Sequence, residues 1–198
     1  MSLKTRFGNL GNILDFDNLT EENIYVLDSP ILTNSQFKKF KKFFSKKVKV
    51  IDCTFDIHGS LKERIELIRE EAETAVREGS TCLVLSDKNI SNQKASIPSI
   101  LTVGAVHSHL VKHGLRGYCS LNVECSDAMD THSFAILIGV GATTVNPYLA
   151  IDSIYQRFEK KLFGKSDFET CVTKFKKSVD AGLLKIMSKM GISVISSY

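Results

Sequence analysis

The stretch IPSILTVGAVHSHLVKHGLRGYCSLNVECSDAMDTHSFAILIGVGATTVNPYLA, residues 97–150, decides the fold of this chain. Pro98 suits the first turn of a helix, where its missing N–H costs nothing. Apolar residues then recur at helical spacing as far as Leu110, and Gly114 stands where a helix-ending glycine is expected. The first half of the stretch therefore predicts a helix that is followed by a short strand over residues 120–123.

The second half of the stretch repeats this order. The apolar run Phe134 to Val140 predicts a helix, residues 143–146 predict a strand, and Pro147 opens another helix. Gly139-Val140-Gly141 resembles the start of a dinucleotide-binding loop, but the third glycine is absent. The preceding run is helical, which is the wrong order for a phosphate cradle. We therefore predict a tight helix-to-strand turn at these glycines.

The rest of the chain continues the alternation of strands and helices. The predicted elements are a short strand at 24–27, a strand at 48–55, a helix at 61–77 capped by Ser60 with Glu63 at the capping-box spacing, a buried strand at 81–85, a last helix from Asp167 to about Lys189 capped by Ser166, and a strand at 192–195. This order predicts an α/β fold, a parallel β-sheet built from repeated βα units. Ligands in such folds bind beyond the carboxyl ends of the strands.

The chain has a length and composition typical of one folded domain. Its 198 residues suffice for a hydrophobic core, and 43% hydrophobic and 24% charged residues are ordinary values. We expect residues 1–198 to form a single domain, with 1–47 as an irregular and helical lead-in and 48–198 as the βα core. Residues 1–20 have the texture of loop and turns. No run reaches the ~18 apolar residues of a membrane span, and no secretory signal follows Met1.

The five cysteines are odd in number, widely spaced and free of any CxxC pair. Cys53, Cys82 and Cys119 lie in apolar, strand-like runs. This pattern predicts buried free thiols in a reducing cytoplasm and disfavours a zinc ribbon.

Positive charge is confined to one segment. Seven lysines lie between residues 38 and 49 with no acid among them, so the net charge of +4 leaves about −3 for the rest of the chain. The lysines could contact phosphates while Phe37, Phe40, Phe43 and Phe44 stack on bases, as in a nucleic-acid-binding module. The phenylalanines fall at helical spacing, however. We therefore favour a core-facing stripe with a solvated lysine face.

Four of the five histidines lie in the opening stretch. His109 and His113 are four residues apart on a predicted helix, a spacing that can share a metal ion, and His107 is nearby. The glutamate of an HExxH motif is missing. Gly114 places His113 at the helix end, where a protonated histidine complements the helix dipole, and we favour this structural role.

Two further groups are candidates for chemistry at strand ends. His132 together with Glu124 or Asp127 could perform acid–base work, although no nucleophile or cofactor signature accompanies them. Asp87 follows a buried strand, where α/β proteins place functional groups. It could equally cap the loop amides of residues 88 and 89, and both interpretations stay open.

Long motifs of the chain resemble one family. IPSILTVGAVHSHLVKHGLR (97–116), CSLNVE (119–124), HSFAILIGVGATTVNPYLA (132–150) and GLLKIMSKMGISVISSY (182–198) closely resemble the central region of the glutamate synthase large subunit. MSLKTRFGNLGNIL, SPIL and LVLSDKNIS fit the same family in the same order, so the resemblance covers essentially the whole chain. Ser108 and the Asp130–Ser133 segment replace histidines that the family usually has, which indicates that the histidines are not indispensable catalysts.

The resemblance implies a parent enzyme, an oxidoreductase that makes two L-glutamate from L-glutamine and 2-oxoglutarate with NADPH, NADH or ferredoxin as electron donor. In that family an N-terminal cysteine hydrolyses glutamine, ammonia crosses an internal tunnel, and FMN and an iron–sulfur cluster reduce the iminoglutarate. The chain would be the central, non-catalytic domain, related in topology to the FMN-binding β/α barrel. It would link the glutaminase and synthase domains and wall the tunnel, with no catalytic, metal or cofactor site of its own, and the isolated fragment is expected to be inactive.

The implied partners are the glutaminase and FMN domains of the same polypeptide and an electron-donating small subunit or ferredoxin, in the cytoplasm, without nucleic acid or membrane. The alternative is a self-standing FMN-dependent β/α oxidoreductase. The segment 185–193 would lie near the junction with the FMN barrel. The candidates for interdomain or tunnel-side residues are Asp87, Lys185, Ser188, Lys189, Met190 and Ser193.

Overall fold

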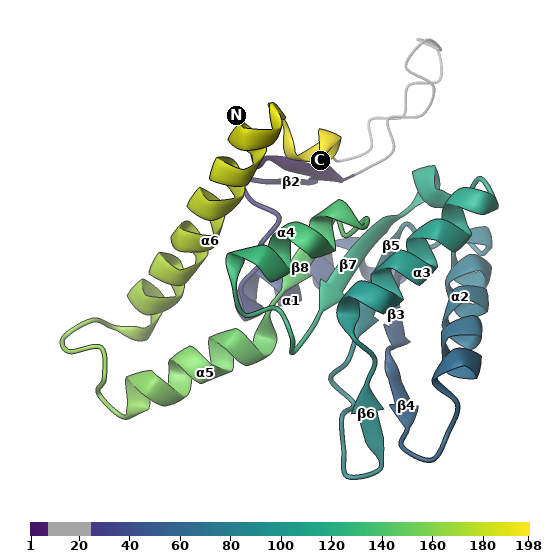
Figure 1. Ribbon diagram of the computed structural model, residues 1–198, viewed down its shortest axis with the longest axis horizontal. Helices are drawn as coiled ribbons and strands as arrows, with labels where there is room; N and C mark the ends of the chain where they lie inside the picture. The colour runs from purple at the N-terminus through teal and green to yellow at the C-terminus, as the bar shows by residue number, and fades with distance from the viewer. Residues whose placement is uncertain (8–24) are drawn as a thin grey trace.

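The structure, a computed structural model, describes residues 1–7 and 25–198 (Figure 1). Most of the loop and turns expected over residues 1–20 lie outside the described residues. The strands are β1 Thr5–Phe7, β2 Tyr25–Leu27, β3 Val48–Asp52, β4 Thr54–Asp56, β5 Cys82–Ser86, β6 Lys94–Ser96, β7 Ser120–Glu124 and β8 Thr144–Asn146. The α-helices are α1 Asn34–Phe44, α2 Leu61–Arg77, α3 Ser99–Lys112, α4 Thr131–Gly139, α5 Tyr148–Glu159 and α6 Phe168–Met190, and short 3-10 helices are η2 Ser45–Lys47, η3 Arg116–Tyr118 and η4 Ile195–Ser197.

The central sheet has four parallel strands in the order β3-β5-β7-β8. Neighbouring strands follow each other along the chain, which is the strand order of β/α barrels. The predicted α/β fold with repeated βα units is therefore confirmed. The strand predicted over 48–55 is interrupted at Cys53, after which β4 pairs antiparallel with β6 beyond the carboxyl ends of β3 and β5.

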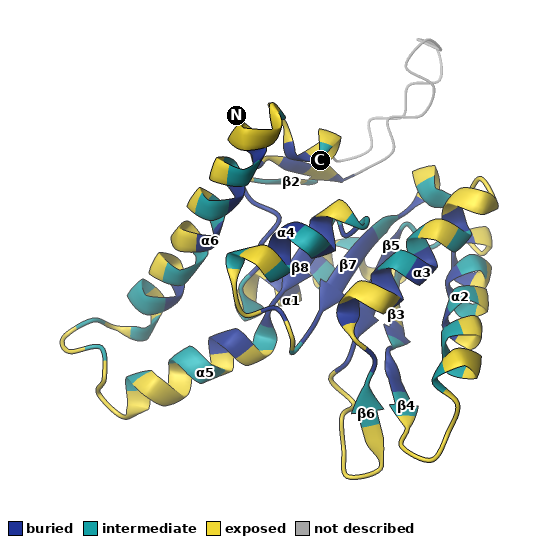
Figure 2. Ribbon diagram, viewed as in Figure 1, coloured by how far each residue is buried: buried dark blue, intermediate teal, exposed yellow. Residues whose placement is uncertain are grey.

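Helices cover both faces of the sheet because successive side chains of a strand point to opposite sides. On β5, Leu83 and Leu85 belong to the main core, which lies between the sheet and the helices α2, α3 and α4. In Figure 2 the buried residues of these helices are dark blue. Cys82 and Val84 belong to a second core, where α1 contributes Phe37 and Phe40. Alternate side chains of β5 therefore pack against different helices on the two faces of the sheet.

The helix ends follow from local capping. Ser60 caps α2 as predicted, since its hydroxyl accepts a hydrogen bond from the amide of Glu63. Helix α6 begins one residue later than predicted: Asp167, rather than Ser166, accepts the amide of Thr170 at 2.7 Å. Gly191, with a φ of 70°, ends α6 in the left-handed conformation that favours glycine.

The two ends of the described chain are joined by backbone bonds. β1 pairs antiparallel with β2, so the predicted strand at 24–27 is confirmed over residues 25–27, residue 24 lying outside the described residues. The loop prediction is wrong at residues 5–7. The predicted strand at 192–195 is also wrong, because Val194 makes one isolated bridge to Ser2 and the chain then turns into η4. The amide of Ser2 donates to Ser193 O at 2.8 Å. Within the described ranges, no helix has the length and apolar character needed to cross a membrane.

Candidate functional site

Polar side chains gather where β5 and β7 end. These strands pair in register, Ser86 opposite Glu124, so the residues that follow them are brought together. We call this group the carboxyl-edge cluster; it consists of Ser86, Asp87, Lys88, Glu124, Ser126 and Tyr148. It occupies the edge of the sheet at which the sequence predicted ligand-binding residues.

Asp87 lies at the centre of the carboxyl-edge cluster and is only 2% exposed. Its Oδ2 accepts hydrogen bonds from Ser126 N at 3.0 Å, Ser126 Oγ at 2.6 Å and Ser96 Oγ at 3.1 Å. The side chain of Asp87 therefore does not cap the amides of residues 88 and 89, which was one of the two interpretations of the sequence. Its Oδ1 is buried with no hydrogen-bond partner among the described residues. Burial, and then the charge of Asp87, raise the pKa of the Tyr148 phenol beside it.

Glu124 is buried and is neutralised by two lysines. Its Oε2 accepts a bond of 2.8 Å from Ser86 Oγ, and its Oε1 pairs with Lys88 Nζ at 3.0 Å and Lys41 Nζ at 3.5 Å. Burial alone would raise the pKa of Glu124, but the bonds from Lys88 and Ser86 and the lysine charges outweigh it and hold the pKa below its usual value. Because Lys41 belongs to α1, this ion pair connects α1 to the carboxyl end of β7.

The polar side chains inside the sheet were not predicted from the sequence. Asn122 accepts a hydrogen bond of 2.7 Å from Thr144 Oγ1 and donates to Leu83 O at 3.1 Å. Asn146 Nδ2 donates to Leu32 O at 2.9 Å, in the segment before α1. The available signal was the period of two in β7, where polar residues alternate with apolar ones.

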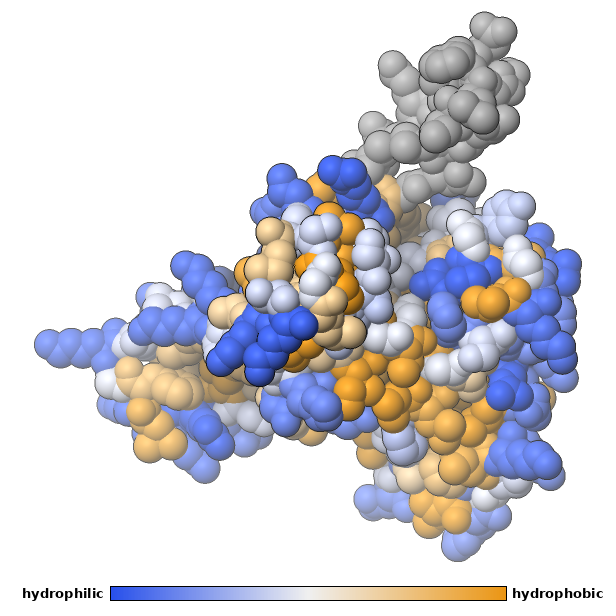
Figure 3. Space-filling model, turned by 45° about the horizontal axis from the view of Figure 1, so that its top comes forward, coloured by the Kyte–Doolittle hydropathy of each residue, from blue (hydrophilic) through white to orange (hydrophobic). Residues whose placement is uncertain are grey.

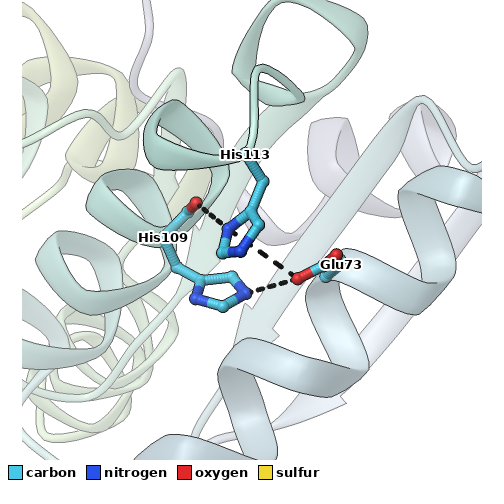
Figure 4. Close-up of side chains that lie close together, drawn as sticks. All are labelled: Glu73, His109 and His113. Carbon is cyan, nitrogen blue, oxygen red and sulfur yellow. Dashed lines mark hydrogen bonds and ion pairs between the residues drawn. The ribbon is translucent and has the colours of Figure 1, made fainter.

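The histidine pair of α3 meets an acidic residue of α2 (Figure 4). His109 Nε2 lies 2.7 Å from Glu73 Oε2, and His113 Nδ1 lies 3.8 Å from the same oxygen. The rings of His109 and His113 are 4.3 Å apart. Hydrogen bonds from Arg77 and then from His109 hold the pKa of Glu73 below its usual value. An HExxH motif has a glutamate between its two histidines, and this sequence does not. Here Glu73 of the neighbouring helix α2 places a carboxylate beside the two histidines.

The structure contradicts the proposed grouping of His132 with Glu124 or Asp127. Glu124 is engaged by lysines, and Asp127 accepts the amide of Ser99 at 2.9 Å where α3 begins. His132 is exposed in the first turn of α4 and bonds to neither of these carboxylates within the described residues.

The glycines after α4 form the predicted helix-to-strand turn. α4 ends at Gly139, and Gly141 has a φ of +122°. Arg116, which the sequence did not single out, holds this turn by donating to Gly141 O at 2.9 Å and to Cys119 O at 2.6 Å. Its Nε also donates to His107 Nδ1 at 3.1 Å, so this histidine has a structural partner.

An open groove of about 410 Å³ lies at the opposite, amino edge of the sheet, between the end of α2 and η3. Its lining residues are Val76, Arg77, Gly79, Ser80, Thr81, Leu115 and Tyr118. None of the residues that the sequence predicted for a site lines this groove.

The lysine segment is largely the packed helix that the sequence predicted. Phe37 and Phe40 are buried, which leaves them unable to stack on bases, whereas Phe43 is 48% exposed and departs from the predicted core stripe. The solvated lysine face is incomplete, because Lys41 pairs with Glu124 and Lys49 pairs with Glu71 at 3.0 Å.

The cysteines are free, as predicted, and Cys53, Cys82, Cys119 and Cys125 are buried while Cys171 is half-buried. Burial raises the pKa of Cys53 to about 12, so its thiol stays protonated at neutral pH.

The remaining predicted site residues lie near the end of α6. Lys185, Ser188, Lys189, Met190 and Ser193 are exposed. Figure 1 shows this end of α6 beside the two chain ends, whereas Asp87 follows the carboxyl end of β5. The structure therefore does not bring the two groups together.

The topology and the carboxyl-edge cluster define the class of protein. It is a β/α domain in which the strands of the parallel sheet lie side by side in the order in which they occur along the chain. The family model for the glutamate synthase central domain matches residues 1–198. This chain belongs to the glutamate synthase central domain family, as its motifs had indicated.

Relatives of known identity are much longer proteins. The chain is 50% identical over its whole length to the NADPH glutamate synthase large chain of Azospirillum brasilense, of which it spans 13%. It is 39% identical over its whole length to the chloroplastic ferredoxin-dependent glutamate synthase of Spinacia oleracea, again spanning 13%. Among solved structures, DHODH from Eimeria tenella in complex with ferulenol matches 76% of this chain and 36% of that chain, with 15% identity and a TM-score of 0.49.

Proposed function

We propose that this chain is the non-catalytic central domain of a glutamate synthase, where it links the glutaminase domain to the FMN and iron–sulfur synthase domain and walls the ammonia tunnel. The parent enzyme would make two L-glutamate from L-glutamine and 2-oxoglutarate. Membership of the central domain family carries this proposal and favours it over a self-standing FMN-dependent oxidoreductase. Relatives named for NADPH, ferredoxin and NADH all match, and the electron donor would be one of these.

The internal contacts of the carboxyl-edge cluster support a structural role. In β/α barrel enzymes, catalytic side chains at this edge point into an accessible site. Here Glu124 is bound by Lys41 and Lys88, and Phe40 of α1 fills the adjoining face of the sheet. The polar groups thus stabilise the packing of α1 on the sheet.

An exposed apolar surface supports contact with a neighbouring domain. Five large apolar side chains near the carboxyl edge are each between 42% and 50% exposed; they are Ile57, Ile90, Ile100, Leu101 and Met129. Figure 3 shows apolar surface over this part of the molecule, where α3 begins and β4 pairs with β6. Contiguous apolar surface of this kind marks interaction sites. We call it the carboxyl-edge apolar patch.

The joining of residues 2 and 193–195 suits a linking role. The amide of Ser2 donates to Ser193 O and the amide of Ile195 donates to Ser2 O. A polypeptide that enters at β1 and leaves after residue 195 does so at one corner, so flanking domains would attach side by side.

We propose that residues 1–198 form one domain and that the exposed end of α6 contacts the synthase domain. Of the tunnel-side candidates, Asp87 would lie buried beneath the carboxyl-edge apolar patch, and Lys185, Ser188, Lys189, Met190 and Ser193 would lie at that second contact.

The test compares two exposed apolar residues of α3 in a full-length synthase that contains this chain. Leu101 lies in the carboxyl-edge apolar patch, and Val111 lies at the other end of the helix with 54% exposure. Leu101→Asp should leave glutamine hydrolysis intact while lowering the glutamate formed from 2-oxoglutarate per glutamine hydrolysed. Val111→Asp should leave that ratio unchanged. Equal effects of the two substitutions, or turnover of glutamine and 2-oxoglutarate by residues 1–198 alone, would contradict the proposal.

A further inference from the structure

The side chains of Glu73, His109 and His113 converge between α2 and α3 (Figure 4). One ligand atom from each lies within 4.8 Å of the other two. These three residue types together form the donor set of many zinc sites, in which a water completes the coordination. We propose that Glu73, His109 and His113 bind a transition-metal dication of the Zn²⁺ type, a site that is separate from the linking role argued above.

The distances are close to those that a bound ion requires. With metal–ligand distances of about 2.1 Å and tetrahedral angles, neighbouring ligand atoms are about 3.4 Å apart. Glu73 Oε2 lies 2.7 Å from His109 Nε2, which is shorter than this value, and one ring nitrogen of His113 lies within 4.8 Å of the ligand atoms of Glu73 and His109. Rotations about the side-chain bonds would bring the three ligand atoms to the required spacing.

The surrounding hydrogen bonds orient the ligands. Arg77 Nη2 and Nε both lie 2.8 Å from Glu73 Oε1, which leaves Oε2 facing the histidines. His113 Nδ1 donates to the carbonyl of His109 at 2.8 Å, so the neutral ring keeps its lone pair on Nε2. Such bonds from a ligand to a carbonyl are typical of metal-binding histidines. An ion would replace the hydrogen bond that now joins His109 and Glu73.

The donor set also selects the kind of ion. Two imidazoles and one carboxylate suit Zn²⁺, Co²⁺, Ni²⁺ and Cu²⁺, whereas Mg²⁺ and Ca²⁺ require oxygen ligands. The side chains of Glu73, His109 and His113 are 22%, 19% and 35% exposed, so an ion can enter without opening the fold.

The experiment is a calorimetric titration of the metal-free 198-residue chain with Zn²⁺ and, separately, with Mg²⁺. We expect one Zn²⁺ per chain, a rise in the melting temperature with Zn²⁺ concentration, and no such response to Mg²⁺. His109→Ala, His113→Ala and Glu73→Gln should each weaken Zn²⁺ binding at least tenfold. Glu73→Gln keeps a hydrogen-bond partner for His109, so it separates loss of the ligand from loss of the fold.

Two control substitutions exclude binding elsewhere on the chain. His58 is exposed outside the site, and Cys171 is the most accessible thiol of the described residues. His58→Ala and Cys171→Ser should leave Zn²⁺ affinity unchanged. Binding of Co²⁺ should also produce the visible absorption of a tetrahedral ion, and the His109 variant should lose it. Zn²⁺ binding that survives both histidine substitutions, or that does not differ from the Mg²⁺ response, would show that the three residues only join α2 to α3.

Discussion

The hydroxyl of Ser126 donates a hydrogen bond of 2.6 Å to Oδ2 of Asp87, and the two residues follow different strands, β7 and β5. The same oxygen accepts the amide of Ser126 and the hydroxyl of Ser96. One buried carboxylate therefore joins three segments that are distant in sequence, so it is a sensitive point of the fold.

Replacing Asp87 tests this junction. Asp87→Ala should lower the free energy of unfolding by about 2–4 kcal/mol, because buried donors lose their acceptor. Asp87→Asn keeps one oxygen for these donors and should cost less. Urea denaturation at neutral pH measures both. Asp127 is an exposed carboxylate bonded to Ser99 N, and Asp127→Ala should have a smaller effect. Equal losses at positions 87 and 127 would contradict the prediction.

Glu124 should make stability depend on pH in the acid range. In the folded chain its pKa is below the usual value of a glutamate, so the unfolded chain binds more protons as the pH falls. The contribution of Glu124 is complete above about pH 4.5 and is lost as the pH falls through the lower, folded pKa. Glu124→Gln should be less stable at neutral pH and should show a shallower decline on acidification. Urea midpoints between about pH 3 and 7 measure this. The exposed Glu70→Gln should keep the original slope, and an unchanged slope in Glu124→Gln would contradict the prediction.

Two glycines should respond to alanine in opposite directions. Gly141 has a φ of +122°, and an added Cβ would collide with the ring of His107. Gly141→Ala should therefore lower the free energy of unfolding by at least about 2 kcal/mol. Gly104 lies within α3 with nothing within 4 Å of an added Cβ, and Gly104→Ala should raise it by about 0.5–1 kcal/mol. Thermal melts of both variants measure the difference, and changes of the same sign would refute this account of the turn.

The packing of α1 can be tested with two phenylalanines of the same helix. Phe40 is 0% exposed, and its ring lies 5.0 Å from that of Phe7. Phe40→Ala should lower the free energy of unfolding by about 3–5 kcal/mol. Phe43→Ala should cost less than about 1 kcal/mol, since exposed side chains lose little on truncation. Urea denaturation that finds the two variants equally unstable would show that α1 does not pack as described.

Local signals in the sequence were sufficient for most elements and for the family. The run from Phe134 forms a helix because it is apolar on several sides and is capped by Asp130. The Gly139-Val140-Gly141 turn followed from glycine chemistry in the same way. Residues 192–195 were wrongly predicted as a strand because an apolar run does not reveal whether a neighbouring strand is available to pair with it. Among residues 1–7 and 25–198, Val194 forms a single bridge, to Ser2.

The carboxyl-edge cluster and the group of Glu73, His109 and His113 could not be predicted from the sequence, because their members are distant along the chain and close only in the folded structure. Asp87 was singled out from the sequence because it follows a buried strand, but its partners Ser96 and Ser126 were not. Glu73 lies 36 positions before His109, and no spacing rule connects residues on separate helices. Lys41 was predicted to be solvated, since the lysine run gave no sign that one member would reach a buried carboxylate.

The sequence by itself determined the order of helices and strands, the capping and turn chemistry and the family, because these depend on residues that are neighbours along the chain. Only the tertiary structure decided which polar groups meet. The pairing of Ser86 with Glu124 depends on the register of two strands. The contact of Lys41 with Glu124 and the approach of Glu73 to His109 and His113 depend on how the helices pack. Packing is set by the combined shapes of distant segments, and it is not expressed in any one stretch of sequence.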